Sequence, residues 1–233
     1  MGVIKAVVFD LDDTLYLERD YVASGFREVA EYLSTRSSFD ENEIFRWLWD
    51  QFMSGTRRNT FDLLLQQFPP LSKIATVPDL ITRYRTHTPR LELLDGFGDL
   101  LDTLSAQEAQ TGIITDGPTV CQTAKLRSLD LCSRIHQSVQ TDQWGTEFYK
   151  PHPRAYEYIA AQAGVPACKC VYVGDNPEKD FCGARSLGWG TVRLRLPGQL
   201  HYATDARIGL GADFEAGSVA SLTDFLLSNL ERN

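Results

Sequence analysis

Two kinds of hydrophobic pattern divide the chain. From about residue 110 onward, short apolar runs alternate with segments in which apolar residues recur at helical spacing. Such alternation implies right-handed crossovers between parallel strands, and therefore a sheet covered by helices on both faces. Residues 16–90 lack clear strand runs and show only helical periodicity. We therefore expect an α/β domain of residues 1–15 and 91–233, with a small all-α domain of residues 16–90 inserted after the first strand.

Individual elements follow from the same pattern and from capping signals. The expected strands span residues 6–9, 111–115, 135–140, 170–174 and 191–196. The helices expected between and after them lie near residues 97–107, 119–130, 153–163, 178–187 and 219–231. The insert is expected to hold helices near residues 20–34, 60–68 and 78–87, and one more that Asp40 and Glu43 open as a capping box and that Gly55 ends. The polar loop that begins at Pro197 has no predicted place.

The composition excludes several classes of partner. The formal net charge of −8 over 233 residues argues against a surface for nucleic acid or an anionic membrane, because such surfaces depend on clustered Lys and Arg. No apolar stretch approaches the roughly 20 residues that span a bilayer. No signal-peptide pattern precedes the first strand, so a cytoplasmic location is the default expectation.

The five cysteines agree with that expectation. Their number is odd and no Cys-x-x-Cys pair occurs, so they resemble neither a disulfide framework nor a zinc site. We expect them to be reduced and mostly buried thiols.

Four short polar segments are the candidates for chemistry. They are Asp10-Leu11-Asp12-Asp13-Thr14, Thr115-Asp116-Gly117, Lys150-Pro151 and Gly174-Asp175-Asn176-Pro177-Glu178-Lys179-Asp180. We expect each to lie at or just past the end of a strand. Because the carboxyl ends of parallel strands open onto one crevice, these segments should converge into one cluster of acids, a hydroxyl and a lysine.

The acids of this cluster predict a metal site. The two-residue spacing of Asp10 and Asp12 puts both carboxylates on one side of an extended chain. Crowded like charges resist joint ionisation, and a divalent cation such as Mg²⁺ relieves them. Asp175 is placed to supply a further oxygen. Asp180 falls in the first turn of the next helix, where it either supports the metal site or only complements the helix dipole.

The remaining segments predict a phosphate site. Thr115 offers a hydroxyl and Asp116 and Gly117 offer backbone amides, while Lys150 adds a mobile positive charge. Together these groups balance a phosphate dianion. Each signal alone is weak, because Thr-Asp-Gly is usually a turn and Lys-Pro is usually a solvated loop. The order and placement of all four segments favour the functional interpretation.

In this order the segments closely resemble the four motifs of the haloacid dehalogenase-like hydrolase superfamily. The first motif is Phe9-Asp10-Leu11-Asp12-Asp13-Thr14-Leu15, the second is Thr115, the third is Lys150, and the fourth is Gly174-Asp175 followed by Asp180. The resemblance covers almost the whole chain. It implies a Rossmann-like, doubly wound parallel sheet as the core, with the helical insert as a cap of the first class that closes over the active site.

The resemblance also implies roles for the motif residues. Asp10 would be the nucleophile that forms an aspartyl-phosphate. Asp12 would protonate the leaving alcohol and then deprotonate the attacking water, while its main-chain carbonyl helps to hold Mg²⁺. Asp10 and Asp175 would bind the metal, and Thr115 and Lys150 would neutralise the oxygens of the phosphoryl group.

The acid at position 12 favours a phosphatase over a dehalogenase, because a halide leaving group needs no proton. The leading hypothesis is a Mg²⁺-dependent phosphomonoester hydrolase, a monomer or homodimer, that acts on a small metabolite such as a sugar phosphate, a nucleoside monophosphate or phosphoglycolate. A phosphomutase of the same fold is an alternative. A non-catalytic module that binds a phosphate ligand or a protein is another, although the intact set of motif residues argues against it.

Substrate choice is expected to come from the cap, because the core contacts only the phosphate. Polar candidates near or within the insert include Tyr16, Arg19, Arg57 and Arg58. Arg57 and Arg58 lie between two predicted cap helices, where they can reach a ligand. The alternative interpretation is that these arginines are ordinary solvated surface residues.

Overall fold

The fold is built on a sheet of parallel strands. The computed structural model describes residues 3–231. Within them six strands lie in the order β3-β2-β1-β4-β5-β6, and every neighbouring pair is parallel. The strands are β1 (Ala6–Phe9), β2 (Gln110–Thr115), β3 (Gln137–Gln140), β4 (Cys170–Gly174), β5 (Gly190–Leu194) and β6 (Phe214–Ala216). Every residue of β1 and β4 is buried, as is typical of parallel strands that are covered on both faces.

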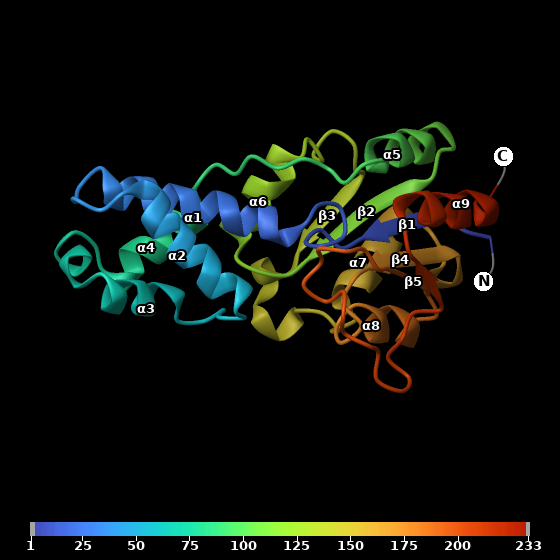
Figure 1. Cartoon of the computed structure of the whole chain (residues 1–233). Helices are drawn as coiled ribbons and strands as arrows, with labels where there is room; N and C mark the ends of the chain where they lie inside the picture. The colour runs from blue at the N-terminus through green and yellow to red at the C-terminus, as the bar shows by residue number, and fades with distance from the viewer. Residues whose placement is uncertain (1–2, 232–233) are drawn as a thin grey trace. The chain divides into compact units, whose positions relative to one another are not determined.

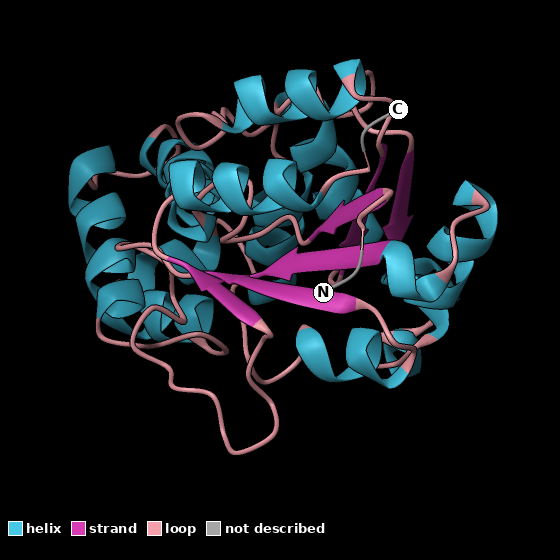
Figure 2. Ribbon diagram, turned by 90° about the vertical axis from the view of Figure 1, so that its right-hand side faces the viewer, coloured by secondary structure: helices cyan, strands magenta, loops and turns pink. Residues whose placement is uncertain are grey.

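Helices cover both faces of this sheet. They are α5 (Phe97–Ala106), α6 (Thr119–Ser128), α7 (Arg154–Ala163), α8 (Phe181–Ser186) and α9 (Val219–Asn229). Figure 1 shows α5 and α9, which contact each other, on one side of the sheet and α7 and α8 on the other. Figure 2 shows the strands between the helical layers. A buried cluster between the sheet and α7 includes Val8, Ile114, Tyr156, Ile159, Tyr172 and Trp189.

The predicted α/β architecture is confirmed, with two local differences. The five expected strands are present, and each end lies within two residues of its prediction. The sixth strand, β6, was not predicted because it has only three residues at the edge of the sheet and follows a polar loop. Helix α8 begins at Phe181 rather than near residue 178, because Asn176 holds a turn there: its carbonyl accepts from the Asp180 N–H and its side chain accepts from the Glu178 N–H.

The chain divides into two compact units, one formed by Met1–Arg19 with Leu91–Asn233 and the other by Asp20–Arg90. The elements of the second unit are α1 (Glu18–Ser34), which begins in the first unit, α2 (Glu41–Met53), α3 (Thr60–Gln67), α4 (Val77–Thr86) and a 3-10 helix at Pro69–Lys73. Asp40 caps α2 as predicted, because its carboxylate accepts from the N–H groups of Asn42 and Glu43. The ring of Phe26 packs against those of Phe52 and Phe61 in the core of this unit. Over residues 3–231, none of the helices is both long enough and apolar enough to cross a bilayer.

The cysteines differ in part from expectation. All five are free thiols, and Cys121 and Cys170 are buried. The expectation that most are buried is wrong, because Cys132, Cys168 and Cys182 are exposed on the surface of the first unit.

Helix α8 approaches the loop that carries Lys150 closely at Gly183, so a substitution of Gly183 tests how much this approach contributes to stability. A Cβ atom at Gly183 would lie 2.2 Å from the carbonyl oxygen of Pro151 and 2.9 Å from the ring of Tyr156. We expect Gly183→Ala to lower the free energy of unfolding by about 1–3 kcal/mol, the usual cost of overpacking, despite the better helix propensity of Ala. Urea denaturation measures this change.

Gly217→Ala is the matched control, because a Cβ atom at Gly217 would meet nothing within 4 Å. This control should unfold at nearly the same urea concentration as the unmodified protein. Equal stability of the Gly183→Ala protein would show that α8 and the Lys150 loop have room to separate.

Candidate active site

The carboxyl ends of three neighbouring strands bring the predicted residues together. Phe9 of β1 pairs in register with Ile113 of β2 and with Val173 of β4. Asp10 directly follows β1, Thr115 is the last residue of β2, and Asp175 directly follows β4. All three side chains are buried, with at most 3% of each residue exposed. The site therefore lies at the crevice that an open parallel sheet forms between its central strands.

Lys150 reaches this crevice from a loop and not, as expected, from a strand end. Two 3-10 turns, Thr141–Trp144 and Thr146–Phe148, separate it from the end of β3. The Lys150 N–H donates to Asp116 Oδ1 at 3.2 Å, and the Thr141 hydroxyl donates to the same oxygen at 2.7 Å. Asp116, predicted to offer its amide to a phosphate, thus also fixes the Lys150 loop through its carboxylate.

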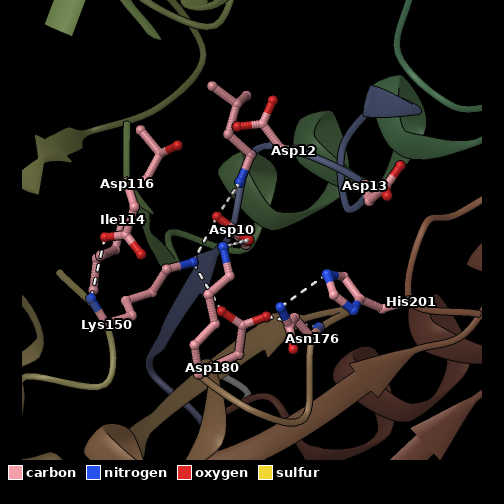
Figure 3. Close-up of polar contacts among 12 residues, drawn as sticks. Asp10, Asp12, Asp13, Ile114, Asp116, Lys150, Asn176, Asp180 and His201 are labelled. Atoms are coloured by element: carbon pink, nitrogen blue, oxygen red, sulfur yellow. Dashed lines mark hydrogen bonds and ion pairs between the residues drawn. The ribbon is translucent and has the colours of Figure 1, made fainter. Parts of the chain in front are cut away.

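The ammonium group of Lys150 lies among three acceptors. Its Nζ is 2.7 Å from Asp10 Oδ1 and 2.8 Å from Asp180 Oδ1 (Figure 3). It also lies 2.9 Å from the hydroxyl of Tyr172. The side chain is completely buried, so the predicted mobile charge is in fact fixed in position. Burial opposes the charged form, but the carboxylates of Asp10 and Asp180 raise the pKa of Lys150 well above its usual range.

Asp180 faces this cluster rather than its own helix. It stands at the start of α8 but makes no capping hydrogen bond with its side chain. Its Oδ2 instead accepts from the N–H of Asn176 at 2.8 Å, and its Oδ1 contacts Lys150. Gly174 permits this approach, because a Cβ atom there would lie 2.5 Å from Asp180 Oδ2. The helix-dipole interpretation of Asp180 therefore does not account for its orientation.

The three buried carboxylates form a group that fits a divalent cation. One oxygen each of Asp10, Asp175 and Asp180 lies within 4.8 Å of the others. Within residues 3–231, Asp10 Oδ2 and Asp175 Oδ2 are buried oxygens without a hydrogen-bond partner. Three carboxylates face the ammonium of Lys150 and, 4.0 Å from Asp10 Oδ2, that of Lys179. Negative charge remains in this group, and a hard divalent cation with oxygen ligands would balance it.

The same crowding changes the acidity of the carboxyl groups. Burial raises the pKa of Asp10, the charge of Lys150 lowers it and that of Asp180 raises it, with a net rise to about 6. Burial, followed by the charges of Asp180 and Asp10, raises the pKa of Asp175 well above its usual range. The ammonium groups of Lys150 and Lys179 therefore only partly offset the effect of burial and of the neighbouring carboxylates on these two groups.

Asp12 belongs to a second, separate group of polar side chains. Its Oδ1 accepts from Lys125 Nζ at 2.7 Å and from the Tyr16 hydroxyl, and its Oδ2 accepts from Gln122 Nε2 at 2.8 Å. Gln122 Nε2 also contacts the hydroxyl of Thr115. Burial alone would raise the pKa of Asp12, but the charge and hydrogen bond of Lys125, aided by Tyr16 and Gln122, lower it. Figure 3 shows the Asp12 carboxylate apart from the group around Lys150.

The loop after β5, which had no predicted place, holds the two acidic loops in position. The buried Arg193 donates from Nε to the carbonyl of Asp175 at 3.1 Å and from Nη2 to the carbonyl of His201 at 2.8 Å. Asp13 accepts from the N–H groups of Glu18 and Leu200, each at 2.7 Å. Asp13, which the sequence left without a role, therefore links the β1 loop to the loop after β5.

The candidate specificity residues lie in different units. Arg19 belongs to the first unit and is half-buried, and its Nε has no hydrogen-bond partner among the described residues. Arg57 belongs to the second unit, where its Nη1 donates to the carbonyl of Phe52 at 2.5 Å and its guanidinium lies 4.1 Å from the centre of the Phe52 ring. Arg58 is exposed. Tyr16, considered with the cap, belongs to the first unit and contacts Asp12.

Several residues around the site were missed in the sequence. Tyr172 was included only in the apolar run of β4, yet its hydroxyl accepts from Lys150. Lys179 lies with its Nζ 4.0 Å from Asp10 Oδ2. Gln122 and Lys125 carried a signal that could have been used: two polar residues three apart stand on the buried face of α6.

Comparison with known proteins identifies the family. The family model for haloacid dehalogenase-like hydrolases matches residues 4–188. The chain belongs to the haloacid dehalogenase-like hydrolase family. It is 32% identical over 203 residues to a glyceraldehyde 3-phosphate phosphatase of Methanopyrus kandleri, with 83% of this chain and 84% of that protein covered.

Two further similarities extend over the whole chain. The glyceraldehyde 3-phosphate phosphatase of Methanocaldococcus jannaschii is 30% identical over 242 residues, with 99% of this chain and 100% of that protein covered. The structure of a HAD-family hydrolase from Deinococcus radiodurans R1 with bound phosphate and sodium aligns with a TM-score of 0.67 at 23% identity, and all of both chains is covered. This haloacid dehalogenase-like hydrolase therefore shares the fold of that structure over its whole length.

Removal of the Asp175 charge should have opposite effects on the stability of the metal-free protein and on its stabilisation by a metal ion. A carboxyl group whose pKa is raised by folding loses stability as the pH rises from its unfolded value through its folded value. At pH 8 in EDTA we therefore expect Asp175→Asn to raise the free energy of unfolding, since each pKa unit of relief is worth about 1.4 kcal/mol. Thermal unfolding with EDTA and with excess Mg²⁺ measures both effects.

With Mg²⁺ we expect the unmodified protein to be more stable than Asp175→Asn. A ligand at 100 times its Kd stabilises the folded state by about 2.7 kcal/mol, and only the unmodified protein has the complete site. Asp224→Asn, an exposed carboxylate of α9, is the control and should change neither value. An Asp175→Asn protein that is less stable in EDTA, or stabilised by Mg²⁺ as strongly as the unmodified protein, would contradict the assignment of a metal site.

Proposed function

We propose that this hydrolase is a metal-dependent phosphatase that removes the phosphate of a small phosphorylated metabolite through an aspartyl-phosphate at Asp10. The observation that carries this proposal is the pair of buried oxygens, Asp10 Oδ2 and Asp175 Oδ2, that accept no hydrogen bond among the described residues and lie beside the fixed ammonium of Lys150. A buried site of this kind has a deficit of positive charge until a cation binds. It suits a reaction in which negative phosphoryl oxygens must be held against a carboxylate nucleophile.

Asp10 is the nucleophile in this proposal because its carboxylate is fixed before the substrate arrives. Its Oδ1 accepts from Lys150 Nζ at 2.7 Å and from the Leu11 N–H at 2.8 Å. Both contacts hold the side chain in one orientation, so little conformational freedom remains to be lost in the reaction. Thr115 and the backbone amides of Asp116 and Gly117 then receive the phosphoryl oxygens.

The reaction proceeds in two balanced steps. An oxygen of Asp10 bonds to phosphorus while the bond from phosphorus to the ester oxygen breaks, and Asp12 gives a proton to the departing oxygen. Approach of the phosphate dianion favours this protonated form of Asp12, because nearby like charge opposes ionisation. Water then attacks phosphorus, Asp12 takes up a proton from it, and the bond between phosphorus and Asp10 breaks to release inorganic phosphate.

Asp10 and Asp175 would hold the divalent cation, with the main-chain carbonyl of Asp12 as a further ligand and Asp180 beside them. Mg²⁺ is the cation we propose, because it combines carboxylate oxygens with substrate phosphate oxygens. When bound, it supplies positive charge that offsets the charge of the phosphoryl group. Lys150, which contacts Asp10 Oδ1, adds a second positive charge beside the phosphoryl group.

The substrate class is proposed from the named relatives. Two proteins at least 30% identical to this chain over most of its length are named glyceraldehyde 3-phosphate phosphatases. We therefore propose a short phosphorylated metabolite of this type as the substrate. The expected location in the cytoplasm and the choice between monomer and homodimer stay predictions.

Phosphate release from a panel of substrates tests the function directly. The panel contains glyceraldehyde 3-phosphate, phosphoglycolate, a sugar phosphate and a nucleoside monophosphate, each with Mg²⁺ or with EDTA. We expect Mg²⁺-dependent release that is fastest for the smallest esters and at least about 10³-fold slower in Asp10→Asn, because the amide cannot form the phosphoryl intermediate. Release that persists in Asp10→Asn, or no release from any member by the unmodified protein, would refute the proposal.

Arg57 is the cap residue proposed to read the substrate. Loss of a charged hydrogen-bond donor to the ligand would cost about tenfold in kcat/KM. We expect Arg57→Ala to change the ratio of kcat/KM for glyceraldehyde 3-phosphate and for phosphoglycolate by about this factor. Steady-state kinetics on both substrates measure the ratio.

Arg36→Ala is the matched control, because Arg36 also stacks on an aromatic ring of its own unit and donates to a backbone carbonyl there. The control should leave the ratio unchanged. An unchanged ratio in Arg57→Ala as well would assign Arg57 to packing on Phe52 alone.

A further inference from the structure

Each of the two acids of the first motif has its own lysine. Asp10 contacts Lys150 from the loop after β3, whereas Asp12 contacts Lys125 from α6. Lys125 is 6% exposed, and lysine is almost never buried unless it is paired. The side chain of Asp12 is 18% exposed, so the pair lies largely out of solvent. Two separate buried ion pairs therefore flank the backbone of Leu11.

The buried face of α6 carries an amide and an ammonium group, where the buried face of a helix is usually apolar. Its buried residues are Cys121, Gln122, Lys125 and Leu126. Gln122 and Lys125 stand three residues apart and so project from the same face of the helix. Burial of an amide and an ammonium group costs free energy that burial of apolar side chains does not cost. These two groups therefore need hydrogen-bond or ion-pair partners inside the protein.

That partner is the Asp12 carboxylate, and its acceptor positions are occupied from two directions. Lys125 Nζ lies 2.7 Å from Oδ1, which also accepts from the Tyr16 hydroxyl, and Gln122 Nε2 lies 2.8 Å from Oδ2. Three donors on two oxygens fix the torsion of a carboxylate that a single contact would leave free to turn.

Gln122 also connects this acid to the phosphate site. Its Nε2 contacts the hydroxyl of Thr115 as well as Asp12 Oδ2. The side chain of Gln122 also lies near Gly117, where an added Cβ atom would come within 3.7 Å of Gln122 Cδ. The amide of Gln122 thus sets the position of Asp12 relative to the residues that receive the phosphoryl group.

We propose that Lys125 and Gln122 are positioning residues that hold the Asp12 carboxyl group at the leaving oxygen of the phosphate ester. The inference rests on the proposed function, in which Asp12 exchanges a proton with the alcohol and with water. Neither residue needs to touch the substrate. Their contribution is greatest when the leaving oxygen needs a proton and small when it departs without one.

The leaving group therefore provides the test. Glyceraldehyde 3-phosphate has a poor alkoxide leaving group, and p-nitrophenyl phosphate has a good aryl leaving group. We expect Lys125→Met to lower kcat on the alkyl ester by about 10–100-fold, less than the roughly 10²–10⁴-fold of a complete loss of general acid catalysis because the acid itself remains, and kcat on the aryl ester by less than about threefold. Asp12→Asn should show the same selectivity, and Lys125→Arg should recover part of the loss on the alkyl ester.

A double variant tests whether Lys125 acts through Asp12. Because both residues belong to one hydrogen-bonded group, Asp12→Asn combined with Lys125→Met should be no slower on the alkyl ester than Asp12→Asn alone. This variant also removes both buried charges together, so it is the more favourable one for folding. Tyr16→Phe, which removes one hydroxyl, should show the same selectivity to a smaller degree.

Arg127→Met is the matched control, because Arg127 is an exposed cation on the same helix. It should leave the ratio of the two rates unchanged. Equal losses on both esters in Lys125→Met, or losses that multiply in the double variant, would overturn the proposal, because a structural role alone would produce them.

Failure of this inference is distinguishable from failure of the proposed function. If the unmodified protein releases phosphate, Asp10→Asn does not and Asp12→Asn is selective for aryl esters, the function stands whatever Lys125→Met does. If Asp10→Asn remains active, or if Asp12→Asn shows no selectivity, the proposed function itself fails, and the positioning role fails with it.

Discussion

The site depends on the placement of one buried ammonium among more carboxylates than it can balance. Lys150 contacts Asp10 and Asp180, while Asp175 stands close by and has no ion pair within residues 3–231; all four residues are buried. Burial makes uncompensated charge costly, so the folded protein raises the pKa of Asp10 and Asp175 rather than accept full ionisation. A divalent cation would relieve this cost, and under the proposed function a phosphoryl group would then bind beside a carboxylate that otherwise repels it.

The fold supports this arrangement through contacts distant in sequence. Parallel pairing of β1 with β2 and β4 sets Asp10 and Asp175 at one end of the sheet. Asp116 fixes the Lys150 loop, and Arg193 fixes the backbone of Asp175. Arg193 donates to the main-chain carbonyls of Asp175 and His201 and so holds these loops. It forms no ion pair with the carboxylate of Asp175 that would compete with a metal ion. The rigidity of the acids thus comes from neighbouring loops as much as from the strands.

The sequence predicted the parts of the site that follow from strand periodicity. Asp10, Thr115 and Asp175 stand where apolar runs end, and those runs became β1, β2 and β4. The path of Lys150 was not predictable in the same way, because its loop contains 3-10 turns and is held by Asp116 and Thr141. Contacts such as Arg193 with Asp175, or Lys125 with Asp12, join residues far apart in the chain and leave no periodic signal. The three residues of β6 are likewise too few to show alternation.

The central claim is that Asp10 carries the phosphoryl group during the reaction. Its most direct test is acid quenching of the protein during turnover with Mg²⁺ and glyceraldehyde 3-phosphate, followed by mass spectrometry of the peptide that contains Asp10. We predict a phosphoryl group on Asp10 during turnover, lost when the substrate is exhausted and absent when EDTA replaces Mg²⁺. Phosphate release with no phosphoryl group on Asp10, or with the group on another residue, would contradict the account.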